Sequence, residues 1–328
     1  MKAWQVHRHG EPEQAMRLVE LPDPVPGPGQ VLVRVLGVAL NFPDVLLCRG
    51  TYQERPPLPF TAGVELCGEV LATGPATTAP AATGQRVIGT LALPAGALAE
   101  LAVLPVELAF PAPSTLDDAQ AAAFHIGYQT AWFALHRRAR LAPGETLLVH
   151  AGAGGVGSAA IQLGRAAGAR VVAVVGGPGK VAVARDLGAD LVVDRQGGDF
   201  VAAVQEFTGG RGADVVFDPV GGDAFAGSTR CVAFEGRIVL VGFASGTVPA
   251  PALNHPLIKN YSLVGLHWGR YRQREPGAVR QAHAALTDLA GAGLAVPLVS
   301  ARLPLAAAAA GLTELAAGTT VGRLVVVP

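Results

Sequence analysis

Charged residues are scarce in this sequence of 328 residues. Only 15% are Asp, Glu, Lys or Arg, against about a quarter in ordinary soluble proteins, while half are hydrophobic. Lysine and arginine together number 25, as do aspartate and glutamate, so the formal net charge is zero. A neutral chain has no overall field to attract nucleic acid or an anionic membrane surface. We therefore expect neither partner, and no clustered patch of Lys and Arg.

Cysteine is nearly absent, and long apolar runs are missing. Cys48, Cys67 and Cys231 form an odd, widely spaced set, which fits neither a disulfide framework nor a zinc ribbon. No stretch reaches the roughly 18 apolar residues of a membrane-spanning helix, and the first residues lack the apolar core of a signal peptide. These absences favour a soluble protein of the reducing cytoplasm, long enough for two domains.

What is present changes character near residue 115. Before that point, short apolar runs are separated by turns rich in Gly and Pro, which is typical of a small barrel-like β unit. These runs predict strands at 31–35, 64–70, 86–88 and 99–103.

After residue 115, helix-length segments separate continuous apolar runs. Ser114 or Thr115, with the two acids that follow, predicts a helix start, and the helix should extend over 119–137. Continuous runs indicate strands buried on both faces, as in a parallel sheet covered by helices. They predict a fold of the α/β class with a doubly wound (Rossmann) parallel sheet. The expected strands are 146–150, 170–175, 191–193, 213–217 and 237–241.

The last part of the chain contains one more apolar segment, two stretches with helical spacing and a closing strand. We expect this tail to return to the β-rich first domain and complete it. The segments are 261–266, 278–290, 306–317 and 324–327.

A glycine-rich loop is the strongest single motif. Gly152, Gly154 and Gly157 form G-x-G-x-x-G, directly after a predicted strand and before a helix-compatible segment. The first glycine allows the tight turn, the second lets a pyrophosphate approach the backbone, and the third lets helix and strand pack closely. The phosphates would then bind the N–H groups at the helix start, including those near Gly155 and Val156.

The second strand of this unit ends in Gly176 and Gly177, where NAD-specific sites usually carry Asp or Glu. A carboxylate there would repel a 2′-phosphate, so its absence admits NADP. Lys180 and Arg195 follow the second and third strands, and we expect both to bind that phosphate.

Several separated segments resemble the medium-chain dehydrogenase/reductase superfamily and, within it, the zinc-free quinone oxidoreductase (zeta-crystallin-like) group. The resemblance covers nearly the whole chain. It rests on the glycine loop and on 41–44 (NFPD), 49–52 (RGTY), 59–65 (PFTAGVE), 130–132 (TAW) and 218–222 (DPVGG).

The resemblance implies a GroES-like catalytic domain at 1–118 and 264–328, interrupted by a Rossmann NADP-binding domain at 119–263. It also implies a homodimer joined near Tyr261 to Leu266. Asn41 and Tyr52 would be the catalytic residues, with Asn41 and Thr130 near the nicotinamide and Tyr52 in the acceptor pocket. The NADPH site would be formed by Asn41, Thr130, Gly152, Gly154, Gly155, Val156, Gly157, Gly176, Lys180, Arg195, Val220, Gly242, Phe243, Ser245, Leu266 and Arg323.

Zinc-dependent relatives in the superfamily hold the metal with Cys, His and a third ligand, and zinc needs about three protein ligands. In this sequence Asn41 stands at the expected Cys and Val64 at the expected His, and no cysteine occurs between 91 and 103. We therefore expect no metal. Glu65 is retained, and we expect it to serve as a structural hydrogen-bonding group. Asp44 and Arg49 are expected to pair with each other.

Without a Lewis acid, a ketone would lack polarisation, whereas a quinone accepts hydride readily because the negative charge that develops is delocalised. The sequence thus predicts an NADPH-dependent quinone oxidoreductase. The alternatives are an NADPH-dependent double-bond reductase of alkenals, alkenones or enoyl thioesters, and a non-enzymatic, crystallin-like NADPH-binding protein.

Overall fold

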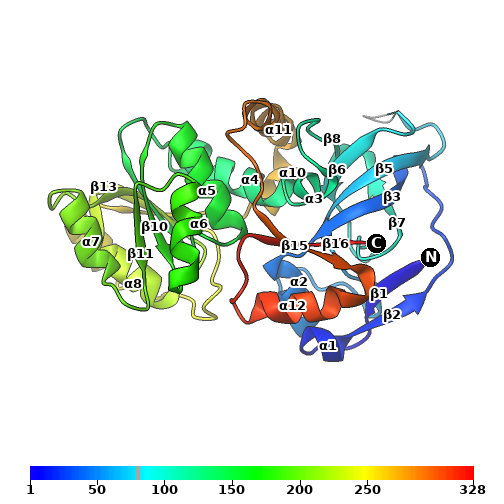
Figure 1. Cartoon of the computed structure of the whole chain (residues 1–328), viewed down its shortest axis with the longest axis horizontal. Helices are drawn as coiled ribbons and strands as arrows, with labels where there is room; N and C mark the ends of the chain where they lie inside the picture. The colour runs from blue at the N-terminus through cyan, green and yellow to red at the C-terminus, as the bar shows by residue number, and fades with distance from the viewer. Residues whose placement is uncertain (79–81) are drawn as a thin grey trace. The chain divides into compact units, whose positions relative to one another are not determined.

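A computed structural model describes residues 1–78 and 82–328. The chain forms two compact units, one from residues 1–126 with 296–328 and the other from 127–295 (Figure 1). The first unit is therefore built from both ends of the chain, as the returning tail predicts.

The first unit is organised around a seven-stranded sheet in which both ends of the chain take part. Its order is β15-β16-β3-β5-β6-β8, and β7 also pairs with β3. Only β15 and β16 are parallel to each other; the other pairs are antiparallel. The strands are β3 (Gln30–Ala39), β5 (Glu65–Thr73), β6 (Arg86–Thr90), β7 (Leu101–Pro105), β8 (Ala109–Pro111), β15 (Val299–Pro304) and β16 (Arg323–Val327).

A smaller antiparallel sheet of order β2-β1-β4 shares the core of this unit. The apolar pattern does not predict β1 or β2, because their buried positions are few and lie among polar residues. These strands are β1 (Lys2–Val6), β2 (Met16–Glu20) and β4 (Phe60–Thr61), and the accompanying helices are α1 (Pro12–Ala15), α2 (Phe42–Arg49) and α12 (Ala308–Ala316).

The second unit contains a six-stranded, fully parallel sheet of order β11-β10-β9-β12-β13-β14. This is the 3-2-1-4-5-6 order of the Rossmann fold, so the α/β prediction is confirmed. The order reverses between β9 and β12, where ligands of such sheets bind beyond the carboxyl ends of the strands. The strands are β9 (Thr146–His150), β10 (Arg170–Val175), β11 (Leu191–Asp194), β12 (Ala213–Asp218), β13 (Val232–Leu240) and β14 (Ser262–Gly265).

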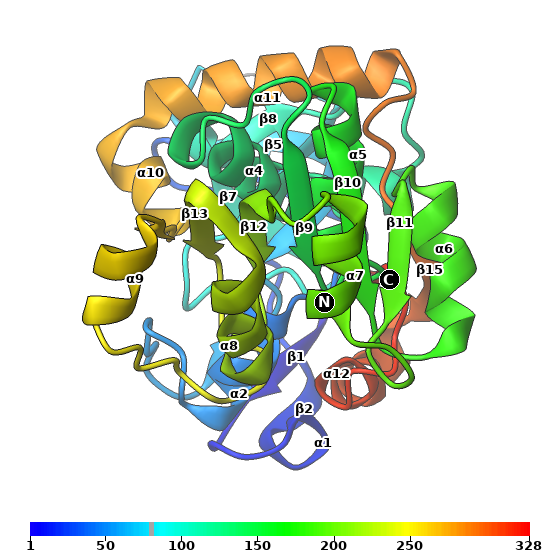
Figure 2. The ribbon, with the colours of Figure 1, turned by 90° about the vertical axis from the view of Figure 1, so that its left-hand side faces the viewer.

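Helices cover both faces of this parallel sheet. In Figure 1, α5 and α6 lie on one side of it, and α7 and α8 lie on the other. Figure 2 shows the neighbouring strands β10, β9, β12 and β13 from another direction. The helices are α5 (Gly155–Ala166), α6 (Val181–Asp186), α7 (Phe200–Phe207), α8 (Gly222–Cys231) and α9 (Asn254–Lys259).

The prediction of one continuous helix over 119–137 is wrong, because the structure has separate helical segments there. A first helix, α3 (Asp118–Ala122), starts at Asp117, whose carboxylate accepts the backbone N–H of Gln120 at 2.8 Å. A second helix, α4 (His125–Trp132), continues into a π-helical segment, η2 (Phe133–Arg138). The break lies close to the point where the first unit ends and the second begins, so α3 belongs to the first unit and most of α4 to the second.

The unit boundaries at 126/127 and 295/296 differ from the expected domain boundaries at 118/119 and 263/264. Residues 264–295, with α10 (Gly269–Arg274) and α11 (Pro276–Gly291), lie in the second unit. They are held there because Gln129 donates to the carbonyl of Val279 at 3.0 Å and the rings of Phe133 and Tyr271 lie 4.3 Å apart.

Arginines of two segments gather in this second unit. Arg137 forms an ion pair with Glu275 at 2.5 Å and lies 5.3 Å from the ring centre of Tyr271. It therefore joins 137–140 (RRAR) to 270–274 (RYRQR). Each segment contains three arginines and the fold places the two segments together, so the expectation that Lys and Arg are not clustered is wrong.

None of the helices in the described residues is long and apolar enough to cross a membrane.

Candidate functional site

The glycine loop lies at the carboxyl end of β9, and its three glycines have separate structural reasons. A Cβ on Gly157 would lie 2.1 Å from the carbonyl oxygen of Ala151, so only glycine fits there. A Cβ on Gly152 would come within 3.0 Å of Ala173 on the neighbouring strand. Gly154 is the N-cap of α5 and has no side chain to accept the first N–H groups of the helix. Those N–H groups are thus available to an anion.

Two cationic side chains lie together beyond the ends of β10 and β11. The guanidinium of Arg195 packs against Gly176, where a Cβ would come within 3.1 Å of its Nε. Burial, and then the charge of Arg195, lower the pKa of Lys180, so the two cations are close enough to interact. A phosphate dianion between them would relieve that repulsion.

Asp194, the last residue of β11, fixes the backbone around these cations. Its Oδ1 accepts the N–H of Gly177 at 2.8 Å and that of Gln196 at 3.1 Å. Gly177 has φ = +104°, a conformation that favours glycine. Asp194 is not among the residues predicted from the sequence. The signal was an acidic residue at the end of a parallel strand, with a glycine loop on the neighbouring strand.

Two further loops, after β12 and β13, contain four of the expected cofactor residues. Val220 and Ser245 are joined directly, because the N–H of Ser245 donates to the carbonyl of Val220 at 3.0 Å. Gly242 and Phe243 lie in the same second loop, and the Phe243 ring is 38% exposed. Leu266 follows β14, and its N–H donates to the carbonyl of Leu240 at 3.0 Å.

In the first unit, Asn41, Glu65 and Arg323 form one buried polar cluster. They are brought together because β16, β3 and β5 are neighbours in the sheet. Asn41 lies just after β3, Glu65 is the first residue of β5 and Arg323 is the first residue of β16. Arg323 donates to Oδ1 of Asn41 at 2.7 Å and to Oε2 of Glu65 at 3.1 Å. The Asn41 amide donates to the same Glu65 oxygen at 2.9 Å and to the carbonyl of Ala39 at 3.0 Å.

Glu65 is the centre of this cluster, and the expected structural hydrogen-bonding role is observed. It is 0% exposed, and its other oxygen, Oε1, accepts the N–H of Ile126 at 2.5 Å. Burial raises the pKa of Glu65, while Arg323 and the Asn41 amide oppose that shift. The cluster therefore balances one buried carboxylate with one buried guanidinium.

Asp44 and Arg49 do not pair, so that expectation is wrong. Arg49 instead forms a two-pronged ion pair with Glu11 at 2.8 and 2.9 Å. Asp44 is buried and accepts the N–H of Asn41 at 2.9 Å, and burial raises its pKa to about 7. Five residues apart on α2, the two side chains lie on different faces of the helix.

Thr130 and Tyr52 belong to different units. Thr130 is on α4 and is 8% exposed. Tyr52 follows α2, and its half-buried ring packs against the core of the first unit.

The residues around Asn41 do not fit a zinc ion. Both amide hydrogens of Asn41 are donated to oxygens, and the Glu65 carboxylate already binds the Arg323 guanidinium. A zinc ion would have to compete with that cation, and Val64 offers no ligand atom. In the described part of the chain, no three His, Cys, Asp or Glu side chains are grouped so that they could hold a metal.

Comparisons with known proteins agree with both units. Residues 27–114 match the alcohol dehydrogenase GroES-like domain, and residues 155–284 match the zinc-binding dehydrogenase family. The quinone oxidoreductase-like protein 2 homolog of Nematostella vectensis is 38% identical over 256 residues, which is 78% of this chain and 69% of that protein.

Solved structures resemble the chain over its whole length. Quinone oxidoreductase of Pseudomonas syringae is 33% identical with a TM-score of 0.91, covering 100% of this chain and 99% of that one. The Escherichia coli quinone oxidoreductase complexed with NADPH is 28% identical with a TM-score of 0.92, covering 100% of both chains. The chain belongs to the medium-chain dehydrogenase/reductase superfamily and, within it, to the quinone oxidoreductase group.

Proposed function

We propose that this protein is an NADPH-dependent quinone oxidoreductase. The observation that carries the proposal is the pair of cations, Lys180 and Arg195, beside Gly176 at the end of β10. They stand where an NAD-specific site would present a carboxylate to the ribose, and they suit a 2′-phosphate instead. The NADPH complex of the Escherichia coli relative supports the same cofactor.

The residues that would hold NADPH lie along the carboxyl edge of the parallel sheet. The N–H groups at the start of α5 would bind the pyrophosphate, with Gly154 leaving room for its approach. Lys180 and Arg195 would bind the 2′-phosphate through charge-assisted hydrogen bonds. When bound, NADPH supplies the hydride that reduces the acceptor. The chain would position that donor against the acceptor.

The acceptor we propose is a quinone, because its reduction needs no metal to polarise a carbonyl. The Asn41 site supplies hydrogen bonds and the Arg323 guanidinium rather than a Lewis acid. Since both hydrogens of the Asn41 amide are already donated, we assign Asn41 to holding Arg323 and Glu65 in place. Tyr52 and Thr130 remain the proposed neighbours of the acceptor and the nicotinamide.

The test is NADPH oxidation by the purified protein with ortho-quinones, para-quinones and alkenones, repeated with NADH and with a chelator. Quinone reduction that prefers NADPH and resists the chelator is the expected result. If alkenones alone were reduced, the cofactor assignment would stand and the substrate assignment would fail. Loss of activity with the chelator, restored by zinc, would refute the metal-free assignment.

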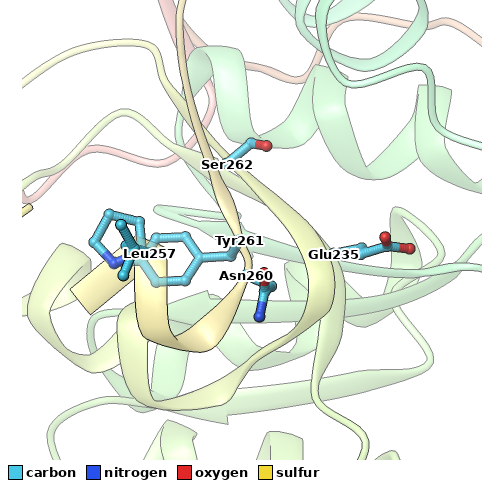
Figure 3. A pocket seen from close by; sticks show the side chains of 6 residues that line it. Glu235, Leu257, Asn260, Tyr261 and Ser262 are labelled. Atoms are coloured by element: carbon cyan, nitrogen blue, oxygen red, sulfur yellow. The ribbon is translucent and has the colours of Figure 1, made fainter. Parts of the chain in front are cut away.

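We further propose that two copies associate along β14. This strand ends the parallel sheet, so its outer edge pairs with no strand of the described chain. Next to it lies a hollow of about 570 Å³ lined by Glu235, Pro256, Leu257, Asn260, Tyr261 and Ser262 (Figure 3). Leu257 is 75% exposed, and its neighbour Ile258 is 69% exposed. A second copy, related by a twofold axis, would pair edge to edge and cover these side chains.

The dimer proposal is tested by light scattering coupled to gel filtration. Leu257→Arg should convert a dimer to a monomer, because it places a charge in the covered face. Leu18→Arg, at a site 40% exposed in the first unit, is the matched control and should leave the dimer intact. A monomeric wild-type protein at micromolar concentration would refute the proposal.

A further inference from the structure

The last residue of β12, Asp218, is a fully buried carboxylate with an unusual set of partners. Its Oδ1 accepts two successive backbone N–H groups, from Val220 at 2.8 Å and from Gly221 at 2.9 Å. Its own carbonyl oxygen accepts the N–H of Val241 at 2.9 Å. One residue at the point where the strand order reverses therefore binds both the loop that follows β12 and the loop that follows β13.

The two loops are also bonded to each other along their length. The first loop is 219–222 and the second is 242–247. The N–H groups of Ala244 and Ser245 donate to the carbonyls of Pro219 and Val220, each at 3.0 Å. The N–H of Gly222 donates in return to the carbonyl of Thr247 at 3.2 Å. The geometry of the first loop thus determines where the second loop lies.

Close packing makes this arrangement intolerant of change. Gly221 has φ = +70°, and a Cβ there would lie 2.8 Å from the carbonyl oxygen of Thr247 and 2.9 Å from Cδ1 of Phe243. Beyond these contacts the second loop has little apolar burial, since residues 243–247 are all exposed and Phe243 is 38% exposed. Hydrogen bonds rather than a hydrophobic core must therefore hold it in place.

We infer that Asp218 is a positioning residue that holds loops 219–222 and 242–247 together as a preformed half of the cofactor site. The inference rests on the proposed function, because these loops carry the proposed cofactor contacts Val220, Gly242, Phe243 and Ser245. The carboxylate acts through the two backbone N–H groups that it binds. Removing it leaves two N–H groups of the first loop without their acceptor, and it loosens the second loop because that loop is hydrogen-bonded to the first.

The chain offers a matched control for the loss of such a bond. Asp190 accepts the N–H of Val171 through Oδ2 at 2.7 Å, at the amino end of the same sheet. Asp190→Ala removes an aspartate-to-backbone bond of the same kind, far from the loops in question along the strands. Asp218→Asn is the conservative variant, because its amide oxygen can still accept both N–H groups.

The first measurement is hydrogen exchange of the backbone amides in the protein without cofactor. Asp218→Ala should raise exchange at Ala244 and Ser245 at least tenfold, while Asp218→Asn and Asp190→Ala should leave these amides near the wild-type rate. Unchanged exchange at these two amides in Asp218→Ala would refute the inference, whatever the protein binds. If Asp218→Ala does not fold, Asp218→Ser is measured against the same criterion, because its hydroxyl is a weaker acceptor.

The second measurement is NADPH affinity by fluorescence titration of the same variants. Asp218→Ala should bind NADPH at least tenfold more weakly, with Asp218→Asn within threefold of wild type and Asp190→Ala unchanged. Equal loss in Asp218→Ala and Asp190→Ala would assign the effect to general destabilisation and overturn the inference. If the wild-type protein binds no NADPH, the proposed cofactor is wrong, and the exchange data alone decide the role of Asp218.

Discussion

Replacing Lys180 by alanine tests the cofactor assignment most directly. Its ammonium group is partly buried and close to the Arg195 guanidinium, and both effects lower its pKa. A bound 2′-phosphate would replace that repulsion with a charge-assisted hydrogen bond. Such a bond contributes about 1.5–3 kcal/mol. Since about 1.4 kcal/mol corresponds to a tenfold change in affinity, Lys180→Ala should weaken NADPH binding about ten- to a hundred-fold.

The assay is a fluorescence titration with NADPH and, in parallel, with NADH, which has no 2′-phosphate. NADPH affinity should fall in Lys180→Ala while NADH affinity stays within about twofold, because the lost contact is specific to the phosphate. Arg185→Ala, on the exposed side of α6, is the control for the change in net charge. Added salt should weaken NADPH binding more in the wild type than in Lys180→Ala, since salt screens exposed charges.

Two results would refute the reasoning. Unchanged NADPH affinity in Lys180→Ala would show that the ammonium group does not bind the phosphate. Equal losses for NADPH and NADH would show that the substitution disturbs the loop after β10 rather than a phosphate contact. In the second case the wild-type preference between the two cofactors would have to be explained by Arg195 alone.

Three other substitutions have definite expected outcomes. Gly157→Ala should abolish dinucleotide binding in titrations, because its Cβ would lie 2.1 Å from the carbonyl oxygen of Ala151. Asp44 has a folded pKa raised to about 7, so its contribution to stability is complete below about pH 4 and is lost as the pH rises toward 7. Asp44→Asn should remove that loss, so the variant should be more stable than the wild type at pH 8, relative to their difference at pH 5. Urea unfolding at the two pH values measures this, and an equal difference at both would show that the assignment is wrong. Arg323→Ala should cost about 3–5 kcal/mol in urea unfolding by leaving the Glu65 carboxylate unpaired, and a loss below 1 kcal/mol would contradict the buried cluster.

The parallel sheet could be read from the sequence because its central strands are buried on both faces. The run of β10, for example, is apolar from Val171 to Val175 and is followed by two glycines, so its type and approximate limits are local properties. The half-buried strands β1 and β2 carry no such local signal, because their apolar residues acquire a partner only in the folded sheet.

The site was predictable only where its chemistry is local. The glycine loop and the cations after β10 and β11 lie within short stretches of sequence. The cluster around Glu65 does not, because Asn41 lies 24 residues away from it in the chain and Arg323 lies 258 residues away. A resemblance can suggest that such residues matter, but only the neighbouring positions of β16, β3 and β5 show that they bind one another.

The contribution of residues 296–328 to the first unit bears on the order in which the chain can fold as it is made. The second unit is one continuous stretch, 127–295, so all its strands are synthesised before the closing segment. The first unit must wait for β16, and until then the Glu65 carboxylate lacks its guanidinium and the end of β3, at Val38 and Ala39, lacks its partner strand. Nascent chains should therefore present a folded nucleotide-binding sheet while the N-terminal unit is still incomplete and exposes apolar surface. The N-terminal unit, although synthesised first, would be the part that depends most on chaperones during translation.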